Sequence, residues 1–401
     1  MPEFSEIVEQ VALEREAIAH GLKKLRDNTR HLEEKNYASA SIYGVTSIDT
    51  LLPLVVKRIE ETNKRIHHHA NGPAFKEIYQ YLEGIEPLAA AGITCKIVID
   101  KVFGHKEDSN LLSRLSESIG KGVETECQMR HYEHHAPGLL TTLKKNYWHK
   151  SCGTQQKVTI IKTLMNRYDV PPWNTWSNSV RVKLGGWLLD CVMNTSQWFD
   201  KETRRGGRKT SVYVVPTPEF MAIKDQVMHD AELFSPMAWP MLVEPNDWSE
   251  SQAGGYILNE VMKGHHMVRR GMGGPIQGEK PYEFLNKIQK VAYTLNSFTV
   301  GVAEKLQKDG TCVGKFQPIC NHDLPNKPVD IAENTEARKQ YRRDAAEVMN
   351  LNAQEFRKSC RTRMTMGLVE RFKNKEKFYI PWSYDYRGRI YPIPSLLTPQ
   401  C

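Results

Sequence analysis

The sequence has no long hydrophobic run. Of its 401 residues, 40% are hydrophobic and 25% are charged, which is ordinary for a globular chain. No apolar stretch approaches the roughly 20 residues that cross a bilayer, and the first residues, Met-Pro-Glu-Phe-Ser-Glu, lack the apolar core of a secretory signal. The composition excludes a disordered tail, a collagen-like fibre and a membrane-spanning protein, so we expect no membrane partner.

Cysteine pairs at metal or redox spacing are also missing. None of the eight cysteines belongs to a C-x-x-C motif, and their spacings match no zinc framework. In a chain without a secretion signal, such cysteines are expected as reduced thiols of a cytosolic protein. The cysteines therefore predict neither a structural metal nor a redox centre.

The length exceeds what one hydrophobic core usually spans, which predicts two or more packed units. The net charge is only +8, but residues 338–377 contain 12 basic and 5 acidic residues, a local excess close to that of the whole chain. A charge run is usually a solvated helix face. Clustered cations also suit a polyanion partner, because neutralising phosphates requires several cations together.

Apolar residues recur every three or four positions along most of the chain and predict a mainly α-helical protein. Ser47 is the expected N-cap of the second helix, and Asn71-Gly72-Pro73 breaks the pattern that precedes it. Residues 235–278 are rich in Pro, Gly and Trp and are expected as an irregular connection. The predicted helices lie at about residues 5–25, 47–59, 74–82, 97–102, 111–127, 155–168 and 180–193, between 284 and 306, from 335, and at 353–372.

One stretch changes to β-favouring residues. Residues 196–201 and 210–215 flank the basic segment Arg204-Arg205-Gly206-Gly207-Arg208-Lys209. Because both glycines can take a positive φ without steric cost, two such runs around Gly-Gly predict a β-hairpin. Its tip is expected at Gly206-Gly207 and would be unusually basic.

Metal and phosphate motifs are weak in this sequence. His131, His134 and His135 lie within about one helical turn of each other, so a zinc hydrolase is one interpretation. The arrangement is not H-E-x-x-H, and a surface or partly buried histidine cluster is the alternative. The glycines at 271–278 fit neither a phosphate loop nor a dinucleotide fingerprint.

The segment 378–391 places two arginines around a glycine inside a run of aromatic residues. Arginine grips phosphate with a planar fork, glycine allows close backbone approach, and aromatic rings offer stacking surface for bases. These residues predict a nucleic-acid or nucleotide contact. The alternative is a structural turn in which arginine pairs with Asp385.

Within this segment, Asp385-Tyr386-Arg387-Gly388-Arg389 resembles the D-x-x-G-R element of single-subunit RNA polymerases, the kind found in T-odd bacteriophages and mitochondria. Residues 323–331 and 357–361 are similar to the thumb of that family, and Trp248 with 254–256 is similar to its irregular N-terminal segment. The resemblance implies a mainly α fold in three parts. These are a promoter-binding and melting domain at 1–280 that carries the β-hairpin, a long-helix thumb at 281–377, and the first strand of a truncated palm at 378–401.

The resemblance also implies roles for individual residues. A loop between helices, here Lys64 to Gly72, would enter an AT-rich minor groove, the hairpin would open the duplex, and the thumb would hold the RNA–DNA hybrid. The implied promoter-loop residues are Lys64, Arg65, His67, His68 and Asn71, and the implied melting residues are Arg204, Arg205, Gly206, Gly207, Arg208 and Lys209. The implied template and hybrid contacts are Arg357, Lys358, Arg361, Asp385, Arg387, Gly388, Arg389 and Tyr391.

In this family, two aspartates bind two Mg²⁺ ions for nucleotidyl transfer, and they lie well downstream of D-x-x-G-R. Only ten residues follow Tyr391, so we expect no catalytic residue and no Mg²⁺ ligand in this chain. The implied function is that of the N-terminal portion of a phage-type DNA-directed RNA polymerase. It would act on promoter DNA, RNA–DNA hybrid and ribonucleoside triphosphates in the cytoplasm of an infected bacterial host.

Two alternatives stay open at this point. The chain could be a non-catalytic DNA-binding subunit, or the partner of a second chain that carries the palm. Cys401 stands where the family usually continues Pro-Gln with Gly, which could mark an intein, a frameshift or a truncated record.

Overall fold

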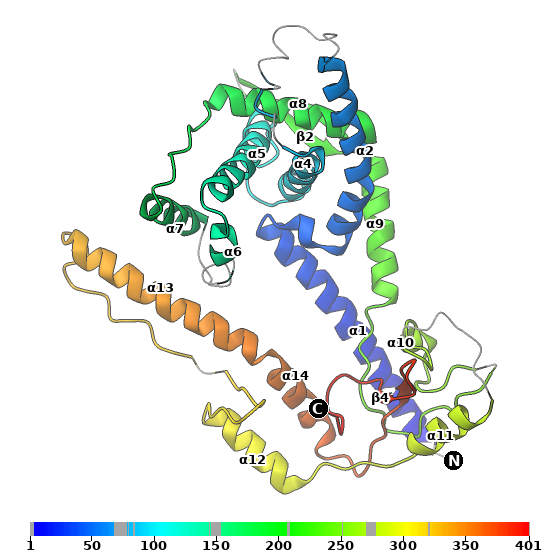
Figure 1. Ribbon diagram of the computed structural model, residues 1–401. Helices are drawn as coiled ribbons and strands as arrows, with labels where there is room; N and C mark the ends of the chain where they lie inside the picture. Colours follow the sequence, from blue (N-terminus) through cyan, green and yellow to red (C-terminus); the bar gives the residue numbers. More distant parts are fainter. Residues whose placement is uncertain are drawn as a thin grey trace. The chain divides into compact units, whose positions relative to one another are not determined.

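The computed structural model is mainly α-helical, which confirms the predicted fold class (Figure 1). Its two compact units are Lys24–Glu232, and Met1–Lys23 with Leu233–Cys401. These units divide the chain at other points than the domain boundaries expected near 280 and 377, which stay predictions. The structure describes residues 4–67, 78, 80–82, 85–143, 145, 154–206, 209–250, 252–269, 278–319 and 321–400.

The unit Lys24–Glu232 is built around a bundle of helices. Its core comes from α2 (Ile42–His67), α4 (Pro87–Val102), α5 (Leu112–His135) and α8 (Asn178–Ser196). The short helix η1 (Ala38–Ala40) precedes α2, and α6 (Leu139–Leu143) and α7 (Thr154–Arg167) lie between α5 and α8 along the chain. The fully buried apolar side chains at the centre include Leu51, Val55, Val98, Leu115, Ile119, Leu184 and Leu188.

Helices α5 and α8 touch backbone to backbone. A Cβ atom on Gly185 would lie 1.8 Å from the carbonyl oxygen of Ser116, and one on Gly120 would lie 2.1 Å from that of Arg181. Only glycine fits at such distances. The two glycines therefore determine how closely the two helices pack.

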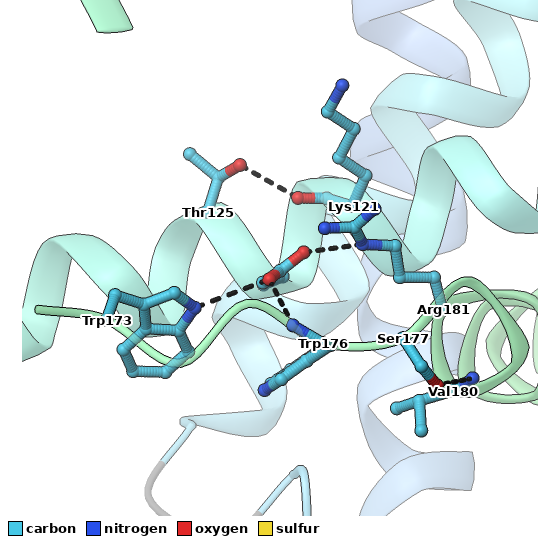
Figure 2. A network of polar contacts seen from close by, with 8 residues as sticks. Lys121, Thr125, Trp173, Trp176, Ser177, Val180 and Arg181 are labelled. Carbon is cyan, nitrogen blue, oxygen red and sulfur yellow. Dashed lines mark hydrogen bonds and ion pairs between the residues drawn. The ribbon is translucent and has the colours of Figure 1, made fainter.

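A buried ion pair lies beside this contact (Figure 2). Arg181 of α8 donates from Nε to Glu124 Oε2 of α5 at 2.6 Å. The other oxygen of Glu124 accepts the indole N–H of Trp173 at 3.3 Å and the backbone N–H of Trp176 at 2.8 Å. Because Glu124 is only 5% exposed, these donors replace the water that its carboxylate has lost.

Two elements of this unit follow α8. The hairpin strands β1 (Phe199–Gly206) and β2 (Lys209–Pro216) pair antiparallel, and α9 (Pro218–Leu233) comes next. Helix α9 has no counterpart among the predicted helices. Pro218 was expected to end the second strand, but proline is well tolerated in the first turn of a helix. The Thr217 hydroxyl caps this helix by accepting the N–H of Phe220 at 3.3 Å.

The second unit combines the first part of α1 (Phe4–Glu34) with the chain after Leu233. Its helices are α10 (Asn259–Met262), α11 (Lys280–Ile288), α12 (Ser297–Lys308), α13 (Thr335–Lys358) and α14 (Cys360–Phe372). The core includes Trp239, Met241, Tyr256, Leu285, Phe372, Phe378, Ile380 and Trp382.

The buried carboxylate of Glu14 anchors α1 in this unit. It accepts the backbone N–H groups of Ile257 at 3.0 Å and Leu258 at 2.7 Å. Burial raises the pKa of Glu14, although these hydrogen bonds and one from Gln10 oppose the rise. A polar side chain on α1 thus organises part of the irregular segment that the composition predicted.

Several predicted helix limits are wrong for local reasons. The second helix begins at Ile42 rather than Ser47, because the Ser41 hydroxyl accepts the N–H of Gly44 at 3.0 Å and caps it. The predicted helix over 353–372 is interrupted at Ser359, which is fully buried between α13 and α14.

Residues 309–334 return along α13 (Figure 1). Two hydrogen bonds hold this connection, from the N–H of His322 to Asn352 Oδ1 at 2.8 Å and from Asn352 Nδ2 to the carbonyl of His322 at 2.9 Å. Among the described residues, no helix is long and apolar enough to cross a membrane.

We predict that Gly185→Ala is destabilising whereas Gly186→Ala is neutral or mildly stabilising. The first Cβ would collide with the Ser116 carbonyl, which costs about 1–3 kcal/mol or more. The second would lie 3.7 Å from the Ser116 hydroxyl, in ordinary contact, and replacing glycine by alanine within a helix gains up to about 1 kcal/mol. Urea unfolding followed by circular dichroism checks both, and equal stabilities would contradict the backbone contact.

Glu124→Ala is predicted to lower the free energy of unfolding by about 2–4 kcal/mol, since it leaves the partly buried guanidinium of Arg181 and two N–H groups without their acceptor. Glu126→Ala is the control on the same helix. Glu126 pairs with Arg130 at 3.0 Å, but both side chains are more than a third exposed. Losing this ion pair should therefore lower the free energy of unfolding by about 0.5 kcal/mol or less. Similar urea midpoints for the two variants would count against the role of Glu124.

Candidate nucleic-acid interface

The D-x-x-G-R residues form a tight connection between two short strands. Strand β3 (Trp382–Tyr384) pairs antiparallel with β4 (Ile390–Pro392), and Asp385 to Arg389 join them. Gly388 has a φ of +74°, a conformation that glycine adopts without strain. Its N–H donates to the Asp385 carbonyl at 3.0 Å, which closes the turn.

The Asp385 carboxylate binds backbone rather than guanidinium groups. One oxygen accepts the N–H of Arg387 and that of Arg389, each at 2.9 Å, and the other accepts the Tyr391 hydroxyl at 3.3 Å. Partial desolvation raises the pKa of Asp385, but these hydrogen bonds, together with the positive charge of Arg389, outweigh it and lower the pKa below its ordinary value. These hydrogen bonds therefore differ from the alternative in which an arginine side chain pairs with Asp385.

The two arginine side chains project from the turn. Arg387 and Arg389 are exposed, and no ion pair joins either of them to a carboxylate within the described part of the chain. Arg387 donates from Nε to the Tyr386 hydroxyl at 2.7 Å, with its guanidinium 5.0 Å from the centre of that ring. Tyr386 itself is 76% exposed. The turn thus presents two cations and one aromatic ring to solvent.

Arg269 is a residue of this site that the sequence did not indicate. Residues 267–269 run parallel to β3, with hydrogen bonds from the Tyr384 N–H to the Met267 carbonyl and from the Arg269 N–H to the Tyr384 carbonyl, both 2.6 Å. The guanidinium of Arg269 lies 4.8 Å from the Tyr391 ring centre and donates to the Ser383 hydroxyl at 3.0 Å. No local pattern marks this pairing, because its partners are more than a hundred residues apart in sequence.

The predicted thumb cations lie on both sides of Ser359. Arg357 and Lys358 end α13, and Arg361 stands in the first turn of α14. All three are exposed. Lys358 Nζ is 3.4 Å from Glu355 and Arg357 donates to the Ala353 carbonyl at 3.1 Å. The three cations are close in sequence and lie on the adjoining ends of α13 and α14.

The predicted hairpin is present, but its strands extend further than expected. Arg204 and Arg205 belong to β1 rather than to the tip, and the register pairs Gly206 with Lys209. Gly207 and Arg208 lie outside the described residues. Within β2, Val214 exchanges hydrogen bonds with Asn110, each at 2.9 Å, which attaches the hairpin to the segment before α5.

The hairpin arginines differ in their surroundings. Arg204 binds Glu202 through Nε at 3.0 Å and Nη2 at 2.8 Å, and its guanidinium lies 4.5 Å from the Tyr213 ring centre. Arg205 points to the opposite face, because successive strand residues alternate. No ion pair is found for Arg205 among the residues described. The charge of Arg204 is therefore paired with a carboxylate, whereas that of Arg205 is not paired with any carboxylate in the described residues.

The predicted promoter loop begins later than expected. Helix α2 continues to His67, so Lys64, Arg65 and His67 are helical rather than part of a loop. His68 and Asn71 lie outside the described residues, so their role stays a prediction.

The three histidines of the zinc hypothesis do not converge on a site. The His131 ring contacts the Pro171 carbonyl at 3.0 Å through Nε2, and the His135 ring contacts the His131 carbonyl at 2.9 Å through Nδ1. In the described part of the chain, no group of three His, Cys, Asp or Glu side chains could hold a metal ion. The geometry gives no support to a zinc hydrolase.

Comparison with curated proteins shows relatives of one kind. T7 RNA polymerase of Escherichia phage T7 is 24% identical over 411 residues, covering 98% of this chain and 45% of the relative. The DNA-directed RNA polymerase of Enterobacteria phage T3 is 22% identical over 413 residues with the same coverage. The DNA-directed RNA polymerase 2 of Arabidopsis thaliana, chloroplastic/mitochondrial, is 22% identical over 302 residues, 69% of this chain and 28% of the relative.

The chain thus spans less than half the length of the phage relatives that it matches. The family described as DNA-directed RNA polymerase N-terminal matches residues 9–270, well over half of the chain. This match agrees with the resemblance based on the D-x-x-G-R turn, which lies beyond the matched range, and the chain belongs to the DNA-directed RNA polymerase N-terminal family.

Proposed function

We propose that this chain is the nucleic-acid-binding N-terminal portion of a phage-type DNA-directed RNA polymerase. In this proposal, the Asp385 turn and the cations around Ser359 contact template or RNA–DNA hybrid. The hairpin assists in opening promoter DNA, and the segment after α2 contacts AT-rich promoter sequence. In this proposal, residues 1–280 bind and open promoter DNA, residues 281–377 form the thumb, and residues 378–401 begin the palm.

The observation that carries the proposal is the use of the Asp385 carboxylate. It holds the backbone amides of Arg387 and Arg389, so its negative charge orients both residues without binding either guanidinium. Two oriented, solvent-facing guanidinium groups next to an exposed tyrosine ring suit a phosphate backbone.

Template-directed RNA synthesis belongs to the proposal for the whole enzyme. Its substrates would be ribonucleoside triphosphates, its metal Mg²⁺, and its setting the cytoplasm of an infected bacterium. The described residues offer no cluster that fits a metal ion, so we assign no Mg²⁺ ligand here.

Replacing Arg387 and Arg389 by glutamine, singly and together, is predicted to weaken binding of the chain to an RNA–DNA hybrid. Each phosphate contact that is lost should reduce the slope of log K against log salt by about 1. Fluorescence anisotropy over a salt series measures the slope. Arg30→Gln is the control, because Arg30 is exposed and paired with Asp27 at 2.9 Å in the other unit. A slope unchanged in the double variant would contradict the proposed contact.

Arg205→Ala is predicted to weaken binding to a forked DNA duplex more than Arg204→Ala does. Arg204 has to give up Glu202 before it can bind phosphate, whereas Arg205 has no such competitor among the described residues. We expect the salt slope to fall by about 1 for Arg205→Ala and by less for Arg204→Ala. Anisotropy with labelled forked DNA checks the order, and the reverse order would show that the strand faces are assigned wrongly.

A further inference from the structure

Helix α14 lines a cavity that the proposed function has not used. The cavity has a volume of about 340 Å³, which lies at the small end of the range of about 300–1,000 Å³ for ligand sites. Its residues from α14 recur every three or four positions and so share one helix face. They are Cys360, Arg363, Met364, Gly367, Leu368 and Arg371.

Trp239 forms an aromatic wall of this cavity. Its ring centre lies 4.8 Å from the guanidinium of Arg371 and 5.8 Å from that of the His20 ring. Arg371 is held by Glu16, with Nη1 to Oε2 at 2.6 Å. Trp239 is only 5% exposed, so its neighbours hold it in place and only a small part of it faces the cavity.

Arg363 supplies a positive charge at the same cavity. It donates from Nε to the Ser359 hydroxyl at 3.2 Å, and its guanidinium lies 4.0 Å from the Phe356 ring centre. No carboxylate pairs with it in the part of the chain that is described. The guanidinium is therefore positioned by neutral groups and keeps its charge for an anion.

Gly367 leaves the middle of the cavity open. A Cβ atom there would meet nothing within 4 Å, although a glycine inside a helix costs about 0.5–1 kcal/mol relative to alanine. At Gly21 the reason for glycine is steric, since a Cβ would lie 2.0 Å from the Ser235 carbonyl oxygen. No contact within the described chain explains the glycine at 367 in that way.

We propose that this cavity binds one nucleotide unit, with the base against the apolar side chains of Met237, Met364 and Leu396 beside Gly367 and the phosphate on Arg363. A flat base suits an apolar surface, and arginine binds phosphate with a planar fork. The inference rests on the proposed function, because a nucleic-acid-binding chain encounters both single strands and free nucleotides. Either source offers the same base and phosphate.

Alkylation of Cys360 tests occupancy directly. Cys360 is exposed and lines the cavity, whereas Cys312 is exposed and does not line it. The chain is treated with iodoacetamide in the presence of uridine monophosphate, oligothymidylate, or an abasic strand of equal length, and labelling of each cysteine is read by peptide mass spectrometry. At ten times the half-protecting concentration, we expect Cys360 to react roughly tenfold more slowly, with Cys312 unchanged.

Each arm of this experiment has a defined meaning. Protection by oligothymidylate alone assigns the site to a nucleotide within a strand, and protection by uridine monophosphate assigns it to free nucleotides as well. Equal protection by the abasic strand overturns the recognition of a base. Absence of protection in all three arms overturns the proposal.

Gly367→Leu provides the matched variant, because it adds a side chain to the cavity from an exposed helical position where a Cβ meets nothing within 4 Å. We expect it to abolish the protection of Cys360, with an unchanged or higher Tm. Gly301→Leu on α12 is the control, since a Cβ there also meets nothing within 4 Å and Gly301 lines no described part of this cavity. Gly367→Ala should retain most of the protection, and full protection in Gly367→Leu would refute the site.

The hybrid-binding series separates this inference from the proposed function. Gly367→Leu should leave the salt slope for the RNA–DNA hybrid at its wild-type value. If the chain binds hybrid through Arg387 and Arg389 but nothing protects Cys360, only the cavity proposal fails. If no hybrid binds, the proposed function fails, and the uridine monophosphate arm still tests the cavity.

Discussion

The contact between the backbones of α5 and α8 is the constraint on which the unit Lys24–Glu232 depends. Gly120 and Gly185 remove the side chains that would hold the helices apart, and Glu124 of α5 can then reach Arg181 of α8. Helix α8 ends at Ser196, Gln197 takes a left-handed φ of 55°, and β1 begins at Phe199. The direction in which the hairpin leaves the bundle therefore follows from the packing of α8.

Two acidic residues show opposite uses of a carboxylate beside arginine. Glu124 is buried and neutralises a guanidinium, so its charge contributes to a fixed structure. Asp385 lies at the surface and binds the amides of Arg387 and Arg389, so the guanidinium groups remain exposed. The first arrangement fits a stabilising role and the second fits a binding role. Sequence alone could not distinguish the two arrangements, because it does not show whether a carboxylate binds the guanidinium or the backbone N–H of an arginine.

What the sequence predicted well are features with local signals. The helical periodicity, the β-favouring runs of the hairpin and the glycine of the D-x-x-G-R turn each depend on neighbouring residues. The cap at Ser41 and helix α9 were missed because competing local signals, at Ser47 and Pro218, pointed elsewhere. Arg269 and the cavity on α14 carry no such signal. They arise where residues more than a hundred positions apart pack together, and a single sequence does not reveal such pairings.

The carboxylate of Glu14 has a consequence for the order of folding during synthesis. Its partners, the amides of Ile257 and Leu258, are made more than two hundred residues later. At about 5–20 residues per second, this part of α1 waits at least roughly ten seconds for them on the ribosome, with its apolar face uncovered. Lys24–Glu232 can complete its own core in that interval, so the inserted unit is expected to fold before the unit that surrounds it in sequence.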